Sequence, residues 1–549
     1  MRDFKNLKMM KNNTIKYFLL FIFILAPSCK KDFEETNKNP NGFTTASDGS
    51  LFNAAVRSLQ STWGEQLYVN ISVLYKQTQQ TALPQVRWNN YTIGTEEIWS
   101  NYYTILPNLR ELEKRFIAMD TTSKVVKNMM AMEKIVLAYK TFKVTDLFGD
   151  VPFSEAGYGF QNVNSLRPKF DTQESIYKTL LGELLWAADN IDPTADNIEP
   201  FITFKKFDNL FFGDLKKWRK FANSLRLRYA MRMVNKEPVL AAKIIKDIIE
   251  NNRPALGVND FGQLIIDPYT ESAALYPYQL GYRNESKGWS FNQSKDVRMG
   301  TTMWHLLSKN DSADGSGIFD PRAYYFFETN NFNKWAPFPN NPQTALQPDG
   351  GIPYEYQRDV AYSIKGATCF YSPVNYYLAR DMDYQPDILM TGAEVLYLRS
   401  EAYLRGIGVA KDPGLATVAF LDGIQYSLNF WQHVMDNSKL PPGTSFATNI
   451  TVPSNLDFIS VQNNIGFFNG DEAEQLREIY AQTWIDQMRQ PQEAFALARR
   501  TLNTPREGDP ITVYRFPIPP SETTYNQLNW LNAIGNAGDD LTQKVWWMN

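Results

Sequence analysis

The chain has 549 residues, of which 43% are hydrophobic and 21% charged, and its formal net charge is −3. This ordinary globular composition allows one large composite domain or several conventional ones, and the balanced charge gives no electrostatic footprint for nucleic acid. Aromatic residues depart from the average, because 13 Trp, 29 Tyr and 35 Phe make up 14% of the chain. Most must form the core. We expect a minority to be exposed and to stack on a ligand, since Tyr and Trp combine an apolar face with a polar group.

The N-terminal segment has the features of a bacterial lipoprotein signal. Basic residues Lys11 and Lys16 precede the apolar run Tyr17–Leu25, which is followed by Ala26-Pro27-Ser28-Cys29. The run is too short to span a bilayer, which takes about 20 residues, and it fits the apolar region of a secretory signal. A small residue before Cys at this place is similar to a lipobox, although Ala stands where Leu is usual and the Pro is also unusual. We predict a signal peptide over residues 1–28 and lipidation of Cys29.

Several consequences follow from that reading of the N-terminus. Lipidation of Cys29 leaves Cys369, the second of two cysteines, without a partner for a disulfide within the chain. The alternative is cleavage at another position, with Cys29 merely near the site. Met10 is an alternative start, because residues 1–9 lengthen the basic segment. Residues 29–50 are polar and rich in Asn, Gly, Ser and Thr, which predicts a lipidated tether leaving the membrane.

Helical periodicity dominates both ends of the remaining chain. Apolar residues recur at spacings of three and four from Val125 to Tyr139, which predicts one stripe of an amphipathic helix. Similar stripes run from Leu389 to Tyr403, from Val418 to Trp431 and from Leu476 to Met488. Asp412-Pro413 precedes the stripe that starts at Val418, and this pair is typical of a helix cap followed by Pro in the first turn. The sequence therefore predicts an all-α scaffold formed by residues 51–258 and 388–549.

The middle of the chain, residues 259–387, has a different character. It is rich in Tyr, Pro, Gly and Asn, as in Tyr276-Pro277-Tyr278, and these residue types favour turns and loops. One helix is expected, around Thr301 to Leu307. We predict a loop-rich insertion that lies over the helical scaffold, within a single domain of residues 51–549. Long ordered loops of this kind are usually functional.

Four segments carry a resemblance to a known family. Their order and their spread along the chain resemble the SusD/RagB family, the substrate-binding lipoproteins of Bacteroidetes nutrient-uptake systems, and the closest likeness is to the subgroup with Asn-Pro-Asn after the tether. The segments are Asp32–Asn41 (DFEETNKNPN), Asp146–Ala156 (DLFGDVPFSEA), Gly213–Arg228 (GDLKKWRKFANSLRLR) and a C-terminal group made of Arg515–Pro519, Asp539-Asp540 and Lys544–Trp547.

The resemblance implies a fold and a function. The fold is a set of stacked, tetratricopeptide-like helix pairs with an irregular segment packed on them. The protein is then a lipid-anchored outer-membrane protein on the cell surface. It captures glycans or oligosaccharides, or peptides in some members, and delivers them to a SusC-like TonB-dependent transporter. The family binds ligand without cutting it, so the resemblance implies no catalytic residue, no cofactor, no metal and no nucleic-acid partner.

The motif residues themselves favour structural roles. Gly149 and Pro152 break a helix into a turn, where Asp146 and Asp150 are expected to accept hydrogen bonds from backbone amides. Two arginines, Arg226 and Arg228, lie on an otherwise apolar helix. They are expected to pair with carboxylates such as Glu394 or Glu401.

The sequence offers little for catalysis. Its two histidines, His305 and His433, look like interface or core residues of helices, and no HExxH, CxxC, phosphate-binding loop or nucleophile elbow occurs. A glycosidase needs only two carboxylates about 5–10 Å apart, which 59 acidic residues do not exclude.

Sugar recognition needs a flat apolar ring face with amide, carboxylate or guanidinium groups at its edges. Trp and Tyr in polar, turn-rich context are therefore the ligand-binding candidates, and the alternative for each is a half-buried ring that fixes a loop to the scaffold. We expect at least one of the three tryptophans in this set to contact ligand. The candidates are Trp88, Tyr91, Tyr282, Trp289, Trp335 and Tyr356.

Four functions stay open at the level of sequence. The leading one is a glycan-binding lipoprotein with an exposed aromatic platform. A peptide binder of the same uptake class would hold its ligand through backbone-bonding groups in an enclosed cavity. A surface glycosidase would release reducing ends, and a structural helical-repeat adaptor would bind no small ligand.

Overall fold

A computed structural model describes residues 46–84, 89–159, 162–259, 261–265, 267–280, 297–330, 332–346, 370–375, 377–378, 384–438, 451–467 and 470–548. Residues 48–549 form one compact unit. Its first helix begins at Asp48, inside the range expected for the tether. The predicted signal peptide and Cys29 lie outside the described residues. Among the described helices, none has the length and the apolar character to cross a membrane.

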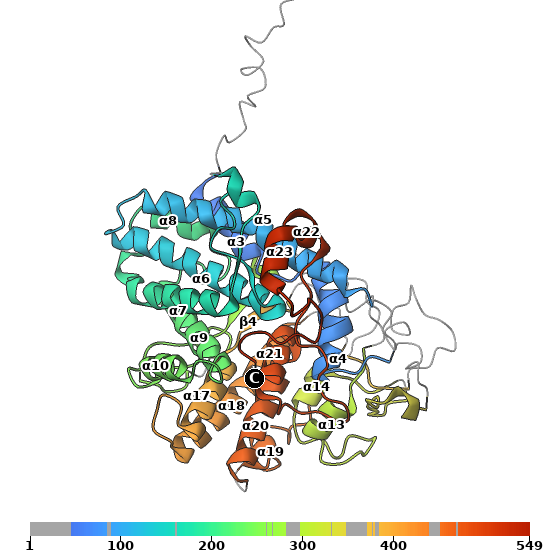
Figure 1. Cartoon of the computed structure of the whole chain (residues 1–549). Coiled ribbons are helices and arrows are strands. Elements are labelled where there is room, and N and C mark those ends of the chain that lie inside the picture. The colour runs from blue at the N-terminus through green and yellow to red at the C-terminus, as the bar shows by residue number, and fades with distance from the viewer. Residues whose placement is uncertain are drawn as a thin grey trace, which may run out of the picture. The chain divides into compact units, whose positions relative to one another are not determined.

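The N-terminal part is a layer of long helices. Helix α6 buries the predicted stripe from Val125 to Tyr139 and ends at Gly149, whose φ of +81° stops the helix. Helix α5 packs against both η1 and α6, and α6 packs against α7 (Figure 1). The helices of this part are α3 (Asp48–Arg57), the π-helix η1 (Glu65–Leu74), α4 (Tyr75–Thr78), α5 (Tyr91–Ile117), α6 (Lys124–Phe148) and α7 (Gln173–Asn190).

Two helical hairpins continue the stack. In Figure 1, α6, α7, α9, α17 and α18 follow one another down the molecule, and neighbours in this series pack together. Asp412 caps α18 by accepting a hydrogen bond from the backbone N–H of Leu415, and Pro413 lies in the first turn, as predicted. The elements are α8 (Phe201–Phe204), α9 (Leu215–Arg232), α10 (Pro238–Ile249), α17 (Gly392–Arg405) and α18 (Pro413–Asn437).

The C-terminal part closes the scaffold. Helix α20 packs on α17, and the predicted stripe from Leu476 to Met488 spans this helix and the 3-10 turn after it. The all-α class is confirmed, and the larger apolar core of the described residues includes Trp218, Trp431 and Trp484. The helices are α19 (Phe458–Gln462), α20 (Glu472–Asp486), α21 (Pro491–Thr501), α22 (Pro520–Tyr525) and α23 (Gln527–Ile534); short 3-10 turns span Val163–Leu166, Pro193–Ala195, Lys205–Phe207, Pro342–Thr344 and Gln487–Arg489.

One boundary differs from the prediction. The stripe from Leu389 to Tyr403 was expected to be a single helix, but Leu389 lies in strand β4 (Asp387–Met390), and α17 starts only at Gly392. The side chain of Thr391 accepts a hydrogen bond from the backbone N–H of Glu394 and so begins the helix there. The spacing of apolar residues alone cannot separate a buried strand from the helix that follows it.

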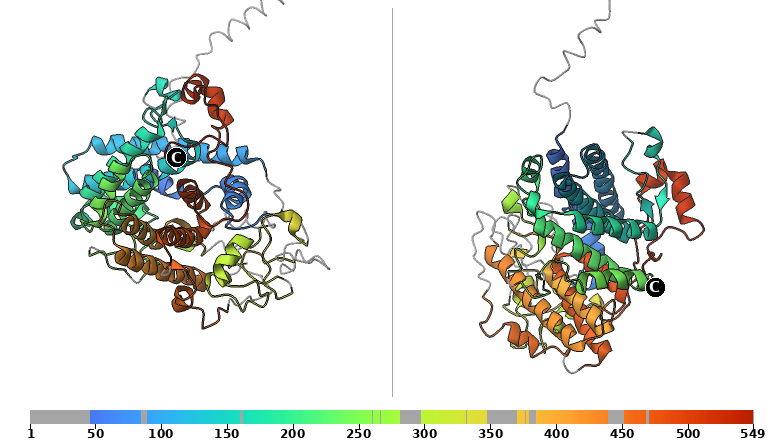
Figure 2. Two further views of the ribbon diagram at one scale, coloured as in Figure 1. Left: turned by 60° about the horizontal axis from the view of Figure 1, so that its bottom comes forward. Right: turned by 90° about the vertical axis from the view of Figure 1, so that its left-hand side faces the viewer.

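The described part of the insertion is mostly irregular, as predicted. Strand β3 (Ala273–Leu275) pairs antiparallel with β4, and β1 (Val151–Pro152) pairs with β2 (Phe170–Asp171) outside the insertion. The predicted helix is α13 (Thr301–Leu307), and α11 (Pro277–Leu280) and α14 (Arg322–Phe326) are further short helices. In the left view of Figure 2 the yellow-green helices lie beside the orange ones, away from the green helices.

A buried arginine fixes the insertion to the scaffold. Arg322 at the start of α14 pairs with Asp320 at 2.7 Å, and both side chains are fully buried. Its guanidinium also donates to Ser427 of α18 at 3.1 Å and to Gln482 of α20 at 2.6 Å. The irregular segment is therefore held at a defined position on two scaffold helices.

The predicted ion pairs and turn contacts are partly right. Arg228 pairs with Glu394, whereas Arg226 pairs with Asp247 of the neighbouring helix α10 at 2.8 Å. Asp150 accepts a hydrogen bond from a backbone amide, that of Gln173, at 2.8 Å. The prediction for Asp146 was wrong, because this residue is buried at the end of α6. Its carboxylate is bonded instead by the side chains of Tyr177, Arg232 and Trp547.

Candidate functional site

Four of the six predicted ligand-binding residues lie outside the described part of the chain. These are Trp88, Tyr282, Trp289 and Tyr356, and they stay predictions. Cys369 also lies outside it. The site is therefore built here from the residues that the structure describes.

Trp335 does not present a free ring face. Its side chain is 5% exposed and stacks on Trp304 with ring centroids 5.9 Å apart and an interplanar angle of 19°. Tyr324 packs against it edge-on at 5.2 Å. Both contacts are within the protein, so this residue matches the alternative of a ring that fixes a loop to the scaffold, and the exposure expected for it is not observed.

Tyr91 also contacts the scaffold. It is the first residue of α5, it is half-buried, and its ring lies 5.7 Å from that of Phe516 in the C-terminal segment. The ring therefore joins two parts of the chain that are far apart in sequence.

A partly exposed group of aromatic rings lies on the insertion beside α18. We call it the tyrosine cluster and define it as Tyr269, Tyr276, Tyr278 and Tyr384. Tyr278 is 43% exposed, and its ring stacks on that of Tyr384 at 5.0 Å with an interplanar angle of 24°. The hydroxyl groups of Tyr269 and Tyr278 are 2.7 Å apart and share a hydrogen bond. The cluster therefore offers ring faces and hydroxyl groups side by side, which is the combination that sugar recognition needs.

The tyrosine cluster rests on a buried base. Tyr276 is 7% exposed, and its ring lies 4.8 Å from that of Tyr269, which also contacts His433 of α18 at 4.4 Å. Burial raises the pKa of both Tyr269 and Tyr276, and for Tyr269 the hydrogen bond with Tyr278 raises it further. Both hydroxyl groups are protonated at neutral pH, as those of ordinary tyrosines are.

A cavity of about 690 Å³ opens at the C-terminal end of α18. We call it the α18 cavity. Ligand pockets commonly measure about 300–1,000 Å³, so this one has a suitable size. Tyr325 and Tyr377 supply rings, while Gln432, Asp436 and Ser438 supply an amide, a carboxylate and a hydroxyl group. Burial raises the pKa of Tyr325 to about 12, so its hydroxyl stays protonated even in alkaline solution.

The α18 cavity and the tyrosine cluster adjoin one another. Gln432 lines the cavity, and the next residue, His433, contacts Tyr269 of the cluster. The side-chain amide of Gln385, next to Tyr384, donates to the hydroxyl of Ser438 on the cavity wall at 2.6 Å. Residues at the end of α18 therefore contact the tyrosine cluster on one side and line the cavity on the other.

A second exposed aromatic pair lies beside Trp335. Phe332 and Phe370 are 51% and 37% exposed, with ring centroids 5.8 Å apart. The buried side chain of Asn330 donates to the carbonyl of Phe370 at 2.7 Å and accepts from the backbone N–H of Phe332 at 2.9 Å. This surface therefore exposes two phenylalanines from different segments, whereas the sequence suggested the tryptophan.

The sequence predicts only part of the tyrosine cluster. The run Tyr276-Pro277-Tyr278 predicts a turn, but Pro277 and Tyr278 lie in the short helix α11, and Tyr276 directly precedes it. Tyr384 lies more than a hundred positions away, and only the β3–β4 pairing brings the two segments together. No local pattern predicts that contact.

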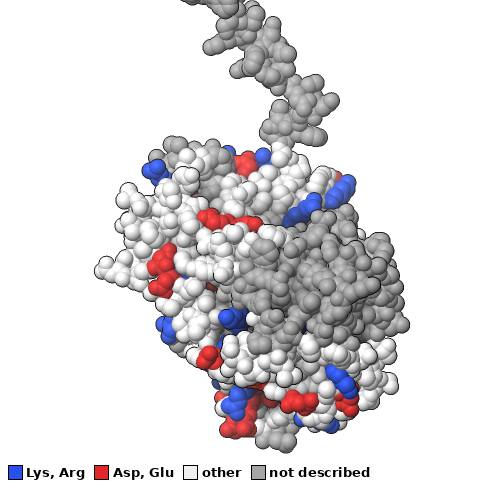
Figure 3. Space-filling model, turned by 90° about the vertical axis from the view of Figure 1, so that its right-hand side faces the viewer, with Lys and Arg blue, Asp and Glu red and all other residues white. Residues whose placement is uncertain are grey.

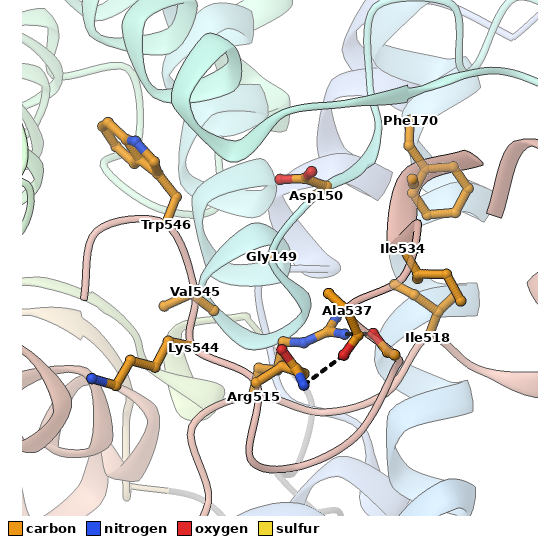
Figure 4. A pocket seen from close by; sticks show the side chains of 13 residues that line it. Gly149, Asp150, Phe170, Arg515, Ile518, Ile534, Ala537, Lys544, Val545 and Trp546 are labelled. Carbon is orange, nitrogen blue, oxygen red and sulfur yellow. Dashed lines mark hydrogen bonds between the residues drawn. The ribbon is translucent and has the colours of Figure 1, made fainter. Parts of the chain in front are cut away.

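A smaller pocket lies between α6 and the C-terminal segment (Figure 4). Its volume of about 160 Å³ is below the usual range for ligand pockets. Arg515 on its wall donates to Asp539 at 2.8 Å and to the carbonyl of Phe148 at 2.9 Å. Because both contacts of this guanidinium are within the protein, we infer that the pocket is a packing gap where the family motifs meet and is not a ligand site.

Charge and metal chemistry add little to the site. On the face shown in Figure 3, acidic and basic side chains of the described residues are scattered in small groups of both signs. Within the described ranges, no group of three or more His, Cys, Asp and Glu side chains is placed to hold a metal ion. His305 is an interface residue of α13, with its Nδ1 atom 2.6 Å from the carboxylate of Glu507.

Comparisons with known proteins agree with this architecture. The profile of the SusD-like family, described as "Starch-binding associating with outer membrane", matches residues 40–503. Among curated proteins, no sequence matches the chain. Solved structures include a protein named as chitin-binding, at 21% identity and a TM-score of 0.67, with 92% of this chain and 100% of that one covered.

Two further structures are similar over nearly the whole chain. A chitin-binding SusD homologue from Flavobacterium johnsoniae is 19% identical, with a TM-score of 0.63 and coverage of 91% of this chain and 98% of that one. A SusD homologue from Parabacteroides distasonis ATCC 8503 is 18% identical, with a TM-score of 0.66 and coverage of 92% and 98%. At these identities the likeness establishes the fold.

Proposed function

We propose, since the chain belongs to the SusD/RagB family, that it is a cell-surface lipoprotein that captures a glycan and delivers it to a SusC-like TonB-dependent transporter. The family description names starch binding at the outer membrane, and two structural relatives are named as chitin-binding. These names support a neutral polysaccharide as the ligand class. The lipid anchor at Cys29 and the transporter partner are expectations from the family resemblance and from the sequence of the N-terminus.

The observation that carries the proposal is the position of the tyrosine cluster beside the α18 cavity. A pyranose presents C–H groups on its faces and hydroxyl groups at its edges. The exposed ring of Tyr278 suits the faces, and the amide of Gln432 and the carboxylate of Asp436 suit the edges. Trp88, Trp289 and Tyr356 stay candidates for further ring contacts. The chain would bind the ligand and pass it on uncut.

The test is a binding panel on the protein from residue 30 onward, read by isothermal titration calorimetry. The panel holds maltooligosaccharides, chitooligosaccharides, other neutral oligosaccharides and peptides. We expect one oligosaccharide class to bind, with a loss of about tenfold in affinity in Tyr278→Ala, which corresponds to about 1.4 kcal/mol. Tyr525→Ala is the matched control, because this tyrosine is 76% exposed on α22 and lies outside the cluster and the cavity.

The other outcomes discriminate among the remaining functions. Binding of peptides alone would favour the peptide-binding members of the same uptake class. Release of reducing ends from the bound oligosaccharide would favour a glycosidase and contradict the proposal. Loss of binding in Trp88→Ala or Trp289→Ala, with Tyr278→Ala unaffected, would support glycan binding but place the ring contact at that tryptophan. Co-purification with a TonB-dependent transporter after mild detergent extraction tests the partner.

A further inference from the structure

A second polar cavity lies between elements of the scaffold, and no residue of the proposed glycan site lines it. It measures about 40 Å³ and is formed where η1, α6, β4 and α21 meet. Its wall includes Glu65 and Asn70 of η1, Lys143 of α6, Asp387 of β4 and Gln490 just before α21. A smaller cavity of about 20 Å³ shares Glu65 and Lys143 with it and extends toward α5. We call the two together the η1 cavity.

Gln490 is the observation that points to an occupant. Its side chain is 5% exposed, and within the described part of the chain neither its amide nitrogen nor its carbonyl oxygen has a hydrogen-bond partner. Leaving a buried polar group unpaired costs about 1–3 kcal/mol, and most buried polar groups in native proteins are bonded to protein or to ordered water. Since Gln490 lines the cavity, its partner is expected there.

Two of the carboxylates around the cavity, Glu65 and Glu493, are already paired. The carboxylate of Glu65 lies 2.7 Å from the ammonium of Lys143 and accepts a hydrogen bond from Gln492 at 2.8 Å. Glu493 pairs with Arg232 at 2.5 Å. Neither Glu65 nor Glu493 needs an added cation. The unpaired group is the neutral side-chain amide of Gln490, which has both donors and an acceptor. An occupant that satisfies Gln490 is therefore small and able both to donate and to accept a hydrogen bond, which a neutral molecule does without adding charge.

Size then selects among such molecules. A buried water needs about 10–15 Å³ of space, so about 40 Å³ holds about three waters and about 20 Å³ holds one more. The surroundings supply the two to four polar partners that each buried water requires. The π-helical turn of η1 places the polar side chains of Glu65, Gln66 and Asn70 on this wall, and π-helical turns are frequent at functional positions.

We propose that the η1 cavity is a structural water site, in which a short chain of buried water molecules bound by Gln490 and Asn70 bridges η1 and α6 to β4 and α21. The first two elements lie in the first third of the sequence and the last two in its last third. The waters therefore complete the contact between the N-terminal and C-terminal parts of the scaffold. The inference is independent of the proposed function, since it concerns no residue of the glycan site.

The test uses the sign of a stability change. Gln490→Met keeps the length of the side chain and removes its amide. In a dry cavity this change removes an unpaired polar group and raises the melting temperature. In a hydrated cavity the same substitution breaks hydrogen bonds to water and lowers the melting temperature. We expect a decrease of about 2 °C in the full chain, on the scale of about 1 kcal/mol.

A matched variant calibrates the measurement. Gln80 is fully buried, and its amide donates directly to the carbonyl of Trp484 at 2.8 Å. Gln80→Met must therefore lower the melting temperature whether or not water is present elsewhere. A decrease in Gln80→Met together with an increase in Gln490→Met would overturn the proposal.

Crystallography tests the occupant directly. We expect ordered waters within hydrogen-bond distance of Gln490 in a crystal structure of the unchanged protein, and fewer of them in Gln490→Met. An empty cavity would overturn the proposal. A rise in melting temperature with added K⁺ or Na⁺ that is absent in Gln490→Met would also overturn it, in favour of a bound cation.

Discussion

Arg228 of α9 and Glu394 of α17 form a buried, two-pronged ion pair, in which the Nε–Oε1 and Nη2–Oε2 distances are both 2.6 Å. The side chains are only 1% and 3% exposed, and the residues are 166 positions apart. The same guanidinium donates to the carbonyl of Leu389 in β4 at 3.0 Å. Arg228 therefore joins α9 to both β4 and α17, at the point where the chain returns from the insertion to the scaffold.

Loss of this carboxylate should be costly. Removing one partner of a buried pair is costly, but Arg228 keeps Glu493 as a second carboxylate partner at 3.4 Å, so Glu394→Gln is expected to lower the free energy of unfolding by about 3 kcal/mol, the lower end of the usual range. Urea unfolding, followed by circular dichroism, measures this change in the free energy of unfolding. The control is Glu250→Gln, because Glu250 pairs with Lys246 at 3.5 Å on the exposed side of α10, where such pairs contribute about 0–1 kcal/mol. Equal small losses in both variants would contradict the assigned role.

The scaffold could be predicted from the sequence because its signals are local. A stripe with a spacing of three and four, as from Val125 to Tyr139 in α6, encodes the helix and its buried face within one segment. The cap at Asp412 is likewise local. Strands β3 and β4 gave no such signal, since each has only a few residues and their pairing joins Ala273 to Met390. Pairings of that separation depend on the whole fold.

The candidate site was harder to predict for the same reason. Turn-rich context suggested an exposed Trp335, but its burial depends on Trp304 and Tyr324, which only the folded loop brings to its ring. The same loop exposes Phe332 instead, held by the side chain of Asn330. Local composition predicts where a surface loop lies, and it does not predict which of its rings faces solvent.

The contrast between these two rings is testable. Trp335→Ala should lower the free energy of unfolding by about 3–5 kcal/mol, because a large buried ring is replaced by a cavity. Phe332→Ala should change it by about 0.5 kcal/mol or less, since this ring is 51% exposed. Denaturant unfolding of both variants decides the point. A stable Trp335→Ala protein that loses glycan binding would restore Trp335 as a ligand contact.

Acid stability should depend on Glu401. Burial alone would raise the pKa of its carboxyl group, but Arg500 and Arg405 outweigh burial and hold the pKa at about 2, below the ordinary 4.5. Both guanidinium groups lie 2.7 Å from the carboxylate. Because the pKa is lower in the folded state, this stabilisation is complete above about pH 4.5 and is lost as the pH falls from there toward 2. Glu401→Gln should be less stable at neutral pH and should show a flatter decline over that interval.

The measurement for Glu401 is a series of urea unfolding curves between pH 7 and pH 3. Glu174→Gln is the control, since Glu174 pairs with Lys178 at the surface, with 44% of its side chain exposed. If the free energy of unfolding falls with decreasing pH as steeply in Glu401→Gln as in the unchanged protein, another group causes the loss of stability in acid.

The role of Tyr278 in binding separates into ring and hydroxyl. Tyr278→Phe keeps the ring that stacks on Tyr384 and removes the hydroxyl that is bonded to Tyr269. If stacking on a sugar dominates, Tyr278→Phe should bind glycan within about threefold of the unchanged protein, whereas Tyr278→Ala loses about tenfold. Calorimetry with the oligosaccharide found in the panel measures both. Equal losses would assign the contribution to the hydroxyl group.

The lipid anchor gives a prediction with a built-in control, because the chain has only two cysteines, Cys29 and Cys369. Cys29→Ser should abolish incorporation of a labelled fatty acid and move the protein out of the outer-membrane fraction, since the acyl chains supply the membrane affinity. Cys369→Ser should leave both the labelling and the fractionation unchanged. Growth with a clickable palmitate analogue, followed by gel fluorescence and membrane fractionation, provides the readout. Label retained in Cys29→Ser would place the acylated residue elsewhere and would remove the tether predicted from residues 29–50.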